Sequence, residues 1–315
     1  MRYRPSRPRR TFVVLLVLVA VVGAFVYVTG TTFLSRPGAP PPPPRPPDAP
    51  DLPAESLVGG QPVRAFFEVE DEGEETIEAR LEVALGRVTT GQAERGTLFQ
   101  AEVALASDRL RPRFEHTTRG DQARVELGLH GGDVSFRGVR ATRGNLWRLY
   151  FSGRTPLDLH LDLTGIPLQR LALTAGMAGA TLRFNEANPV VAERIEVEAG
   201  LSSFTARGLG LARFREFDFD GGVGEFTLDF SGDAFQDGAR ATIDVGMASL
   251  TVLLPEGRPV RLGAPSSFVT HVEVPPRFAA IGRGRWASPG AEHDPAAFEI
   301  DINAGPGKVE VRLVE

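Results

Sequence analysis

Runs in which apolar and polar residues alternate recur along most of the chain, and a glycine follows each run. About four residues after the glycine, two more apolar residues alternate with polar ones. A period of two residues puts one side of an extended strand in the core and the other in solvent. The pattern therefore predicts strands with one buried face. The copies are LEVALG (81–86), LGLHGGDVSF (127–136), LALTAGMAGATLRF (171–184), IEVEAGLSSFTARG (195–208), FDFDGGVGEFTLDF (217–230), ATIDVGMASLTVLL (241–254) and IDINAGPGKVEVRL (300–313).

The glycines of these copies set the length of the repeat. The spacings between successive glycines are 46, 44, 24, 22, 24 and 59. The first two spacings are near twice 22 to 23, so we interpret the pattern as a unit of 22–24 residues with two degenerate copies and one late insertion. A fixed period of this length is typical of solenoids. We predict an all-β, β-solenoid-like body, and the alternative is an antiparallel β-sandwich with hairpins of similar length.

The glycines themselves are predicted to be structural turn residues. A corner of the coil requires a positive φ or the absence of a side chain, and glycine supplies either. The positions four and six residues after each glycine are expected to stack as two columns inside the coil. The turn glycines are Gly86, Gly132, Gly176, Gly200, Gly222, Gly246 and Gly305; the columns are Phe136, Ala180, Phe204, Phe226, Leu250 and Val309, and Gly138, Leu182, Ala206, Leu228, Val252 and Val311.

The stretch EFDFDGGVGEFTLDFSGD (216–233) raises the question of a calcium or phosphate site. The calcium repeat G-G-x-G-x-D requires Asp at position 226, where this chain has Phe226. The G-K-[ST] of a phosphate-binding loop is also missing. Since the phenylalanines occupy the inward positions, Asp218, Asp220 and Asp229 are expected to point outward.

The first sixty residues differ from the rest. Residues 1–10 contain five Arg and no acid, and residues 11–34 contain no charged residue. As a helix, this uncharged segment spans about 36 Å, enough for a bilayer core of about 30 Å. Because positive residues stay on the cytoplasmic side, we predict a single-pass anchor in the cytoplasmic (inner) membrane, with the N-terminus in and the C-terminal body extracytoplasmic. A cleaved signal peptide is the alternative, although its apolar region would be shorter.

The segments that follow are expected to separate the body from the membrane. Residues 36–53 contain ten Pro, which is typical of a stiff extended spacer. Seven acids then lie between Glu68 and Glu78, and we expect a solvated turn there rather than a cation site. The predicted organisation is a basic cytoplasmic tail (1–10), a transmembrane anchor (11–34), a Pro-rich linker (35–60), an exported β-repeat domain (61–263) and its closing strands (264–315).

Three stretches resemble the bacterial toast-rack family and the related C-terminal domain of LiaF-like envelope-stress proteins. They are the G-G-x-G-x-x-x-L-D-F-S-G run at 221–232, the G-M-x-S-L-T-V-x-L-P run at 246–255, and EANPVVAERIEVEAGLSSFTARGLG at 186–210. The resemblance covers roughly residues 75 to 313. It implies an exported, often membrane-tethered β-repeat domain; some members are associated with responses to cell-wall-active antibiotics, and others are described as adhesin-like. One apolar segment here differs from the several membrane helices usual in LiaF-like proteins.

Candidate chemistry is sparse. The chain has no Cys, which excludes disulfides, thiolate zinc sites and cysteine nucleophiles. No two of its five His have the spacing of a ligand pair, and no H-E-x-x-H or G-x-S-x-G motif occurs. Glu196 and Glu198 alternate with apolar residues and are expected to be solvated. Trp147 and Trp286 are expected to pack in the core or cap its ends.

The charge balance completes the functional prediction. The net charge is −5, so the chain beyond its five N-terminal Arg carries −5 − 5 = −10, which argues against a nucleic-acid surface on the body. We predict no catalytic residues, no cofactor, no metal and no small-molecule substrate. The expected function is a non-catalytic interaction or scaffold module of the cell envelope with an envelope protein partner, linked to envelope stress. An adhesin-like or self-assembling surface protein is the alternative, and a carbohydrate-active β-helix that uses surface acids ranks last.

Overall fold

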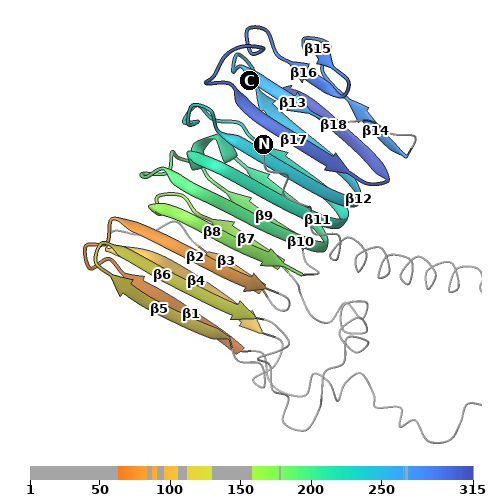
Figure 1. The fold of residues 1–315 in the computed structure, drawn as a ribbon. Helices are drawn as coiled ribbons and strands as arrows, with labels where there is room; N and C mark the ends of the chain where they lie inside the picture. Colours follow the sequence, from red (N-terminus) through yellow and green to blue (C-terminus); the bar gives the residue numbers. More distant parts are fainter. Residues whose placement is uncertain are drawn as a thin grey trace, which may run out of the picture. The chain divides into compact units, whose positions relative to one another are not determined.

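A computed structural model describes residues 63–83, 87–90, 96–105, 112–129, 158–176, 179–264, 266 and 269–314. The chain divides into two units, residues 1–51 and 52–315, and all described residues lie in the second. They form β-strands and one short 3₁₀ helix, η2 (Leu209–Ala212), so the prediction of an all-β body is confirmed (Figure 1). No helix within these ranges is long and apolar enough to cross a membrane; the predicted anchor (11–34) and linker (35–60) lie outside them.

The strands pair in two series, which we call the first and the second wall. In the first wall, pairing is parallel from β6 to β13, while β5, β16 and β15 add antiparallel strands at the two ends. In spatial order its strands are β5 (Arg113–Arg119), β6 (Gln122–Leu129), β2 (Thr76–Val83), β8 (Leu168–Ala175), the first halves of β10 (Ala192–Arg207), β11 (Phe214–Asp229) and β12 (Arg240–Pro255), then β17 (Phe298–Ala304), β13 (Val260–Gly263), β16 (Arg285–Ala287) and β15 (Ala279–Gly282).

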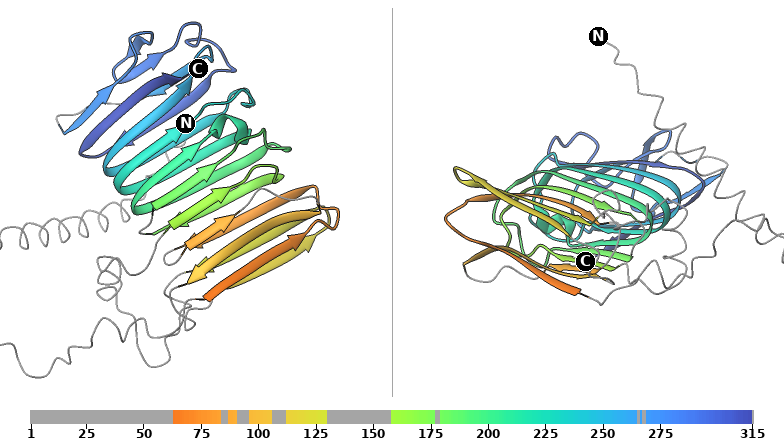
Figure 2. Two further views of the ribbon diagram at one scale, coloured as in Figure 1. Left: turned by 180° about the vertical axis from the view of Figure 1, so that it is seen from behind. Right: turned by 90° about the horizontal axis from the view of Figure 1, so that it is seen from below.

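The second wall contains the other halves of the long strands. Its pairing is parallel from β3 to β14, and β4 is antiparallel to both of its neighbours, β1 and β3. In spatial order its strands are β1 (Val63–Glu70), β4 (Thr97–Leu105), β3 (Arg87–Thr90), β7 (Asp158–Asp162), β9 (Gly179–Arg183), the second halves of β10, β11 and β12, then β18 (Gly307–Val314) and β14 (Thr270–Glu273). Figure 2 shows the two walls face to face.

The pairing register reproduces the repeat read from the sequence. Ile195 pairs with Leu171 in the strand before it and with Phe217 in the strand after it. Ala241 pairs in the same way with Phe217 and with Ile300. The differences in residue number between successive partners are 24, 22, 24 and 59, and these are the last four glycine spacings. A solenoid-like coil is therefore present from β8 to β18.

One feature of the predicted coil is wrong. Leu81 of β2 pairs with Leu127 on one side and Leu173 on the other, so the copy at 127–136 does not lie between its neighbours in sequence. The spacings of 46 and 44 therefore do not reflect doubled units in one continuous coil, since antiparallel β4 and β5 interrupt it. At the other end, β17 and β18 lie between β12 and the strands β13 and β14 that precede them in sequence. The predicted late insertion is therefore present, and it forms the outermost layer.

The core lies between the walls, and the two predicted columns line it. The described members of both columns are at most 4% exposed, and each pairs in register with the member in the next coil. Phe136 and Gly138 lie outside the described residues. Across the core, the ring centroid of Phe219 in the first wall lies 5.2 Å from the ring centroid of Phe226 in the second wall. Full burial of one such side chain contributes about 1.5–3 kcal/mol.

The acidic stretch forms the turn that the sequence predicts, with one difference. β1 ends at Glu70 and β2 begins at Thr76. Glu74, however, is only 7% exposed, because its carboxylate accepts hydrogen bonds from the Glu72 N–H and the Thr118 hydroxyl, both at 2.9 Å. Hydrogen bonds from its own backbone N–H and from Thr118 lower the pKa of Glu74. This acid is therefore a structural residue of the turn.

Candidate interaction surface

The outer face of the first wall carries a ladder of charged side chains that crosses the strands. Because the parallel strands pair in register, residues of equal position in successive coils stand side by side. One such column alternates in sign over most of its length. In spatial order it consists of Arg124, Glu78, Arg170, Arg194, Glu216, Arg240, Glu299 and Arg261.

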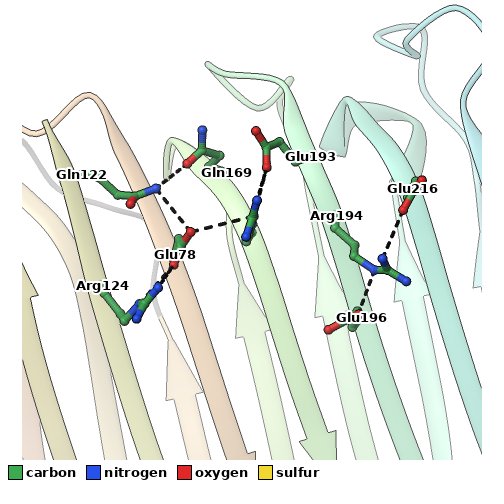
Figure 3. A network of polar contacts seen from close by, with 9 residues as sticks. Glu78, Gln122, Arg124, Gln169, Glu193, Arg194, Glu196 and Glu216 are labelled. Atoms are coloured by element: carbon green, nitrogen blue, oxygen red, sulfur yellow. Dashed lines mark hydrogen bonds and ion pairs between the residues drawn. The ribbon is translucent and has the colours of Figure 1, made fainter.

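Glu78 is the centre of the first part of this ladder (Figure 3). Its side chain is only 15% exposed. Arg124 Nη2 lies 2.5 Å from Glu78 Oε2, and Arg170 Nε lies 3.8 Å from Oε1. Gln122 also donates to Oε1 at 3.3 Å. The hydrogen bond and charge of Glu78 raise the pKa of Arg124. One carboxylate thus connects three neighbouring strands, β6, β2 and β8.

Arg194 of β10 connects neighbouring strands in the same way, two strands further along the first wall. Its guanidinium contacts Glu196 at 2.8 Å and Glu216 at 3.3 Å (Figure 3). It also contacts Asp218 at 2.5 Å. Burial lowers the pKa of Arg194, but the charges of Asp218, Glu196 and Glu216 outweigh this effect and raise it. The planar fork of arginine suits several carboxylates at once, which fixes the relative positions of these charges.

Between these two groups of contacts the face is hollowed into an open groove of about 670 Å³. Its lining includes five arginines and five glutamates, so its formal charges balance. A surface of this composition does not act as a general polyanion or cation trap, because binding of phosphate backbones requires an excess of cations. It suits a partner whose charges match the pattern.

Glu299 lies between two arginines of the ladder, Arg240 and Arg261. It accepts hydrogen bonds from Arg261 at 2.8 and 3.2 Å and lies 2.9 Å from Arg240. The hydrogen bond from Arg261, followed by the charges of Arg240 and Arg261, lowers the pKa of Glu299 below its ordinary 4.5.

This shift predicts how stability depends on pH. The contribution of Glu299 to stability is complete above its unfolded pKa and is lost as the pH falls through the lower folded pKa. We expect Glu299→Gln to be less stable than wild type at pH 7, and the difference to disappear as the pH falls through the lowered pKa of Glu299. Urea denaturation at pH 7, 5, 4 and 3 measures this difference. Parallel stability curves for the two proteins would contradict the prediction.

The residues singled out in the sequence are placed as follows. Glu196 and Glu198 are both exposed on β10, and Glu196 pairs with Arg194, so neither has the burial that a catalytic acid requires. Asp218 is half-buried in the ladder and Asp220 is exposed. Asp229 accepts a hydrogen bond from the Ser231 N–H at 2.8 Å. Phe226 is buried, as the inward position requires.

The glycines between the walls form a column of their own. A Cβ atom at Gly200, Gly222, Gly246 or Gly305 would lie 2.5–2.6 Å from a carbonyl oxygen of the glycine in the preceding coil, and Gly176 is the first acceptor of this series. None of these five glycines has a positive φ. Close approach of two backbones, rather than an unusual backbone conformation, is the constraint at these positions. Gly86 and Gly132 lie outside the described residues.

The histidines and tryptophans do not converge on a site. His116, His160, His271 and His293 are exposed, and His130 lies outside the described residues, as does Trp147. Trp286 is half-buried and packs against the core. Across the described ranges, no group of three or more His, Asp or Glu side chains could hold a metal ion.

Comparison with known proteins identifies the fold. Residues 59–207 match the N-terminal domain of toast_rack, DUF2154. This part of the chain belongs to the toast-rack family. Beyond residue 207 the resemblance to the family stays a prediction, and so does the relation to LiaF-like proteins.

The toast-rack fold has a counterpart of solved structure. The chain is similar to a "putative cell adhesion protein" from Clostridium sporogenes, with 14% sequence identity and a TM-score of 0.50 over 81% of this chain and 100% of that one. At this identity the likeness concerns the fold alone. A search of curated proteins found no match.

The charged ladder was not predicted from the sequence. A signal for it exists, because the residue six positions before each of the last five aligned glycines belongs to the column. These residues are Arg170, Arg194, Glu216, Arg240 and Glu299. The alternation predicts only that these outward positions are solvated, and the sign of their charges is not part of that pattern.

Proposed function

We propose that the chain is a membrane-anchored, exported β-repeat protein of the bacterial cell envelope that binds another envelope protein. In this proposal residues 11–34 cross the cytoplasmic membrane once, and the Arg-rich residues 1–10 stay inside. The Pro-rich linker (35–60) holds the toast-rack body away from the membrane. The uncharged length of residues 11–34 and the five Arg before them support this topology.

The observation that carries the proposal is the groove on the first wall. Its charges are fixed by contacts such as Arg124–Glu78 and Arg170–Glu193, both at 2.5 Å, and they balance one another. Fixed and balanced charges favour specific recognition of a protein surface over general attraction of nucleic acid or membrane. The acids exposed on the same face lack the burial that catalysis requires, which supports a non-catalytic function with no small-molecule substrate.

Arg215 provides a test of this binding surface. It lines the groove, is exposed, and makes no ion pair with any residue that the structure describes. We expect Arg215→Glu to leave the fold intact, because surface substitutions usually change stability by less than about 0.5 kcal/mol. A photo-crosslinker at Ala172, inside the groove, should capture one envelope protein in cells. We expect Arg215→Glu to reduce that capture about tenfold or more, as reversal of a charge within an interface does.

A crosslinker at Ser249, exposed on the second wall, is the matched control. Equal capture from Ala172 and Ser249, or capture from Ala172 that Arg215→Glu does not change, would contradict a binding surface in the groove.

A second candidate function is adhesion or self-assembly. Among the described residues, the long strands β1 and β5 at one end of the body each pair on one side only. This favours adhesion or self-assembly, since unpaired strand edges pair readily with other chains. The name of the structural neighbour agrees with it. A link to envelope stress rests on the resemblance to LiaF-like proteins; increased expression after treatment with cell-wall-active antibiotics would support that link, and unchanged expression would count against it.

A further inference from the structure

The two ends of the body differ in the strand edges that they present. At one end the walls finish with β14 and β15, which have four residues each, and Pro275 and Pro276 follow β14. Short strands and prolines protect an edge from further pairing. At the other end the walls finish with β1 and β5, which have eight and seven residues. Within the described residues each pairs on one side only.

β1 carries the most exposed large apolar side chain of the described residues, Phe66, at 74%. Phe66 points away from the core, on the same side of β1 as Arg64 and Glu68, which are also exposed. The next residue, Phe67, points inward and stacks on Phe114 of β5, with 4.6 Å between ring centroids. Since Phe67 and Phe114 close this end of the core, Phe66 is not needed for the packing of the chain itself.

We propose that β1 pairs with β1 of a second copy of this chain, antiparallel and centred on Phe66. In that register Phe66 faces Phe66 of the second copy. Arg64 faces Glu68 of the second copy, and the two-fold symmetry makes the same pair twice. Aromatic pairs and opposite charges directly across an antiparallel ladder are both stabilising. A parallel arrangement in the same register would instead place Arg64 beside Arg64, so the sequence of β1 favours the antiparallel one.

β5 lacks this self-complementarity, and this contrast selects β1. Antiparallel pairing of β5 with itself, centred on His116, puts Arg113 opposite Arg119 of the second copy, and like charges in that position are destabilising. Within its own chain, Arg64 contacts Glu102 at 3.2 Å, and Glu68 accepts a hydrogen bond from Thr97 at 2.9 Å. Arg64 is nevertheless 74% exposed, which leaves its guanidinium accessible to a second carboxylate.

Charge reversal on β1 tests the proposal and does not depend on the function of the groove. Arg64→Glu and Glu68→Arg each put like charges opposite one another twice in the dimer. We expect each to weaken dimerisation about tenfold, and the double variant to restore it. The double variant restores neither the contact with Glu102 nor that with Thr97, so recovery reports the contact between copies. Sedimentation of the full-length chain in detergent, with far-UV circular dichroism as the control for folding, measures these effects.

A single cysteine gives a second test, since the chain has no Cys of its own. We expect Phe66→Cys in membranes to form a disulfide-linked dimer on mild oxidation, because directly paired side chains have Cβ atoms about 4.5–5.5 Å apart. Ser249→Cys, exposed on the second wall, should form no disulfide-linked dimer. Absence of dimer in both measurements, equal crosslinking of the two cysteine variants, or a double variant no better than the single ones would overturn the proposal.

Discussion

Gly222→Ala is expected to destabilise the body by about 3 kcal/mol, at the upper end of the usual effect of overpacking. The new Cβ would lie 2.6 Å from the carbonyl oxygen of Gly200, and this oxygen belongs to the backbone of the preceding coil. Relief of the contact requires the two coils to separate, although parallel pairing joins β10 and β11 on both sides of this position. A loss of this size lowers Tm by about 6–12 °C in a domain of about 150–250 residues.

Two other glycines make the test specific. Gly179 lies in β9 without a positive φ, and its Cβ would meet only Asp158 Oδ1, at an ordinary 3.6 Å. Since glycine is unfavourable in a strand interior, Gly179→Ala should be neutral or slightly stabilising. Gly257 has a φ of 84° and open space around it, so Gly257→Ala reports backbone strain alone, about 1–2 kcal/mol. Thermal and urea unfolding of the three variants measure these differences. A Gly222→Ala protein as stable as Gly179→Ala would contradict the clash.

The repeat could be predicted from the sequence because a coil imposes the same constraint at the same place in each turn. Leu228 and Val252 are buried and adjacent, and both occupy the same position after their glycine. The order of the terminal strands could not be predicted in this way. Leu127 has the inward position of a coil strand, but its alternation is the same whether β6 lies before or after β2. Alternation specifies which face of a strand is buried, and it does not specify the neighbouring strand.

The charged ladder illustrates the same limit at the level of the site. That Arg194 and Glu216 point outward follows from the alternation around them. Their proximity depends on the register between β10 and β11. The period of the repeat predicts this register, so this contact could be found from the sequence. The contact between Glu78 and Arg170 could not be predicted, because it depends on β2 lying beside β8, which is distant from it in the sequence. The part of the groove formed by β2 and β6 could therefore be recognised only in the structure.

Asn188→Leu should destabilise the protein by at least about 4 kcal/mol, because it removes four hydrogen bonds that this side chain makes with the backbone. Asn188 is 2% exposed. Its amide donates to Leu168 O at 2.7 Å and Ala212 O at 3.2 Å, and its carbonyl accepts from Leu168 N at 3.1 Å and Val190 N at 3.3 Å. It thereby joins the preceding coil, through Leu168, to the following coil, through Ala212.

Asn188→Asp distinguishes loss of hydrogen bonds from a change of shape. A carboxylate fits the same space, but it replaces the donating Nδ2 with an oxygen that faces the carbonyl oxygens of Leu168 and Ala212. This repulsion raises the folded pKa of the new acid. The destabilisation by Asn188→Asp should therefore decrease as the pH falls below neutral, in contrast to that of Asn188→Leu. Asn303→Leu is the control, since Asn303 is exposed and its expected effect is below about 0.5 kcal/mol. Urea unfolding at pH 7 and pH 5 separates the three variants. Equal effects of Asn188→Leu and Asn303→Leu, or a pH-independent effect of Asn188→Asp, would show that Asn188 does not hold the coils together.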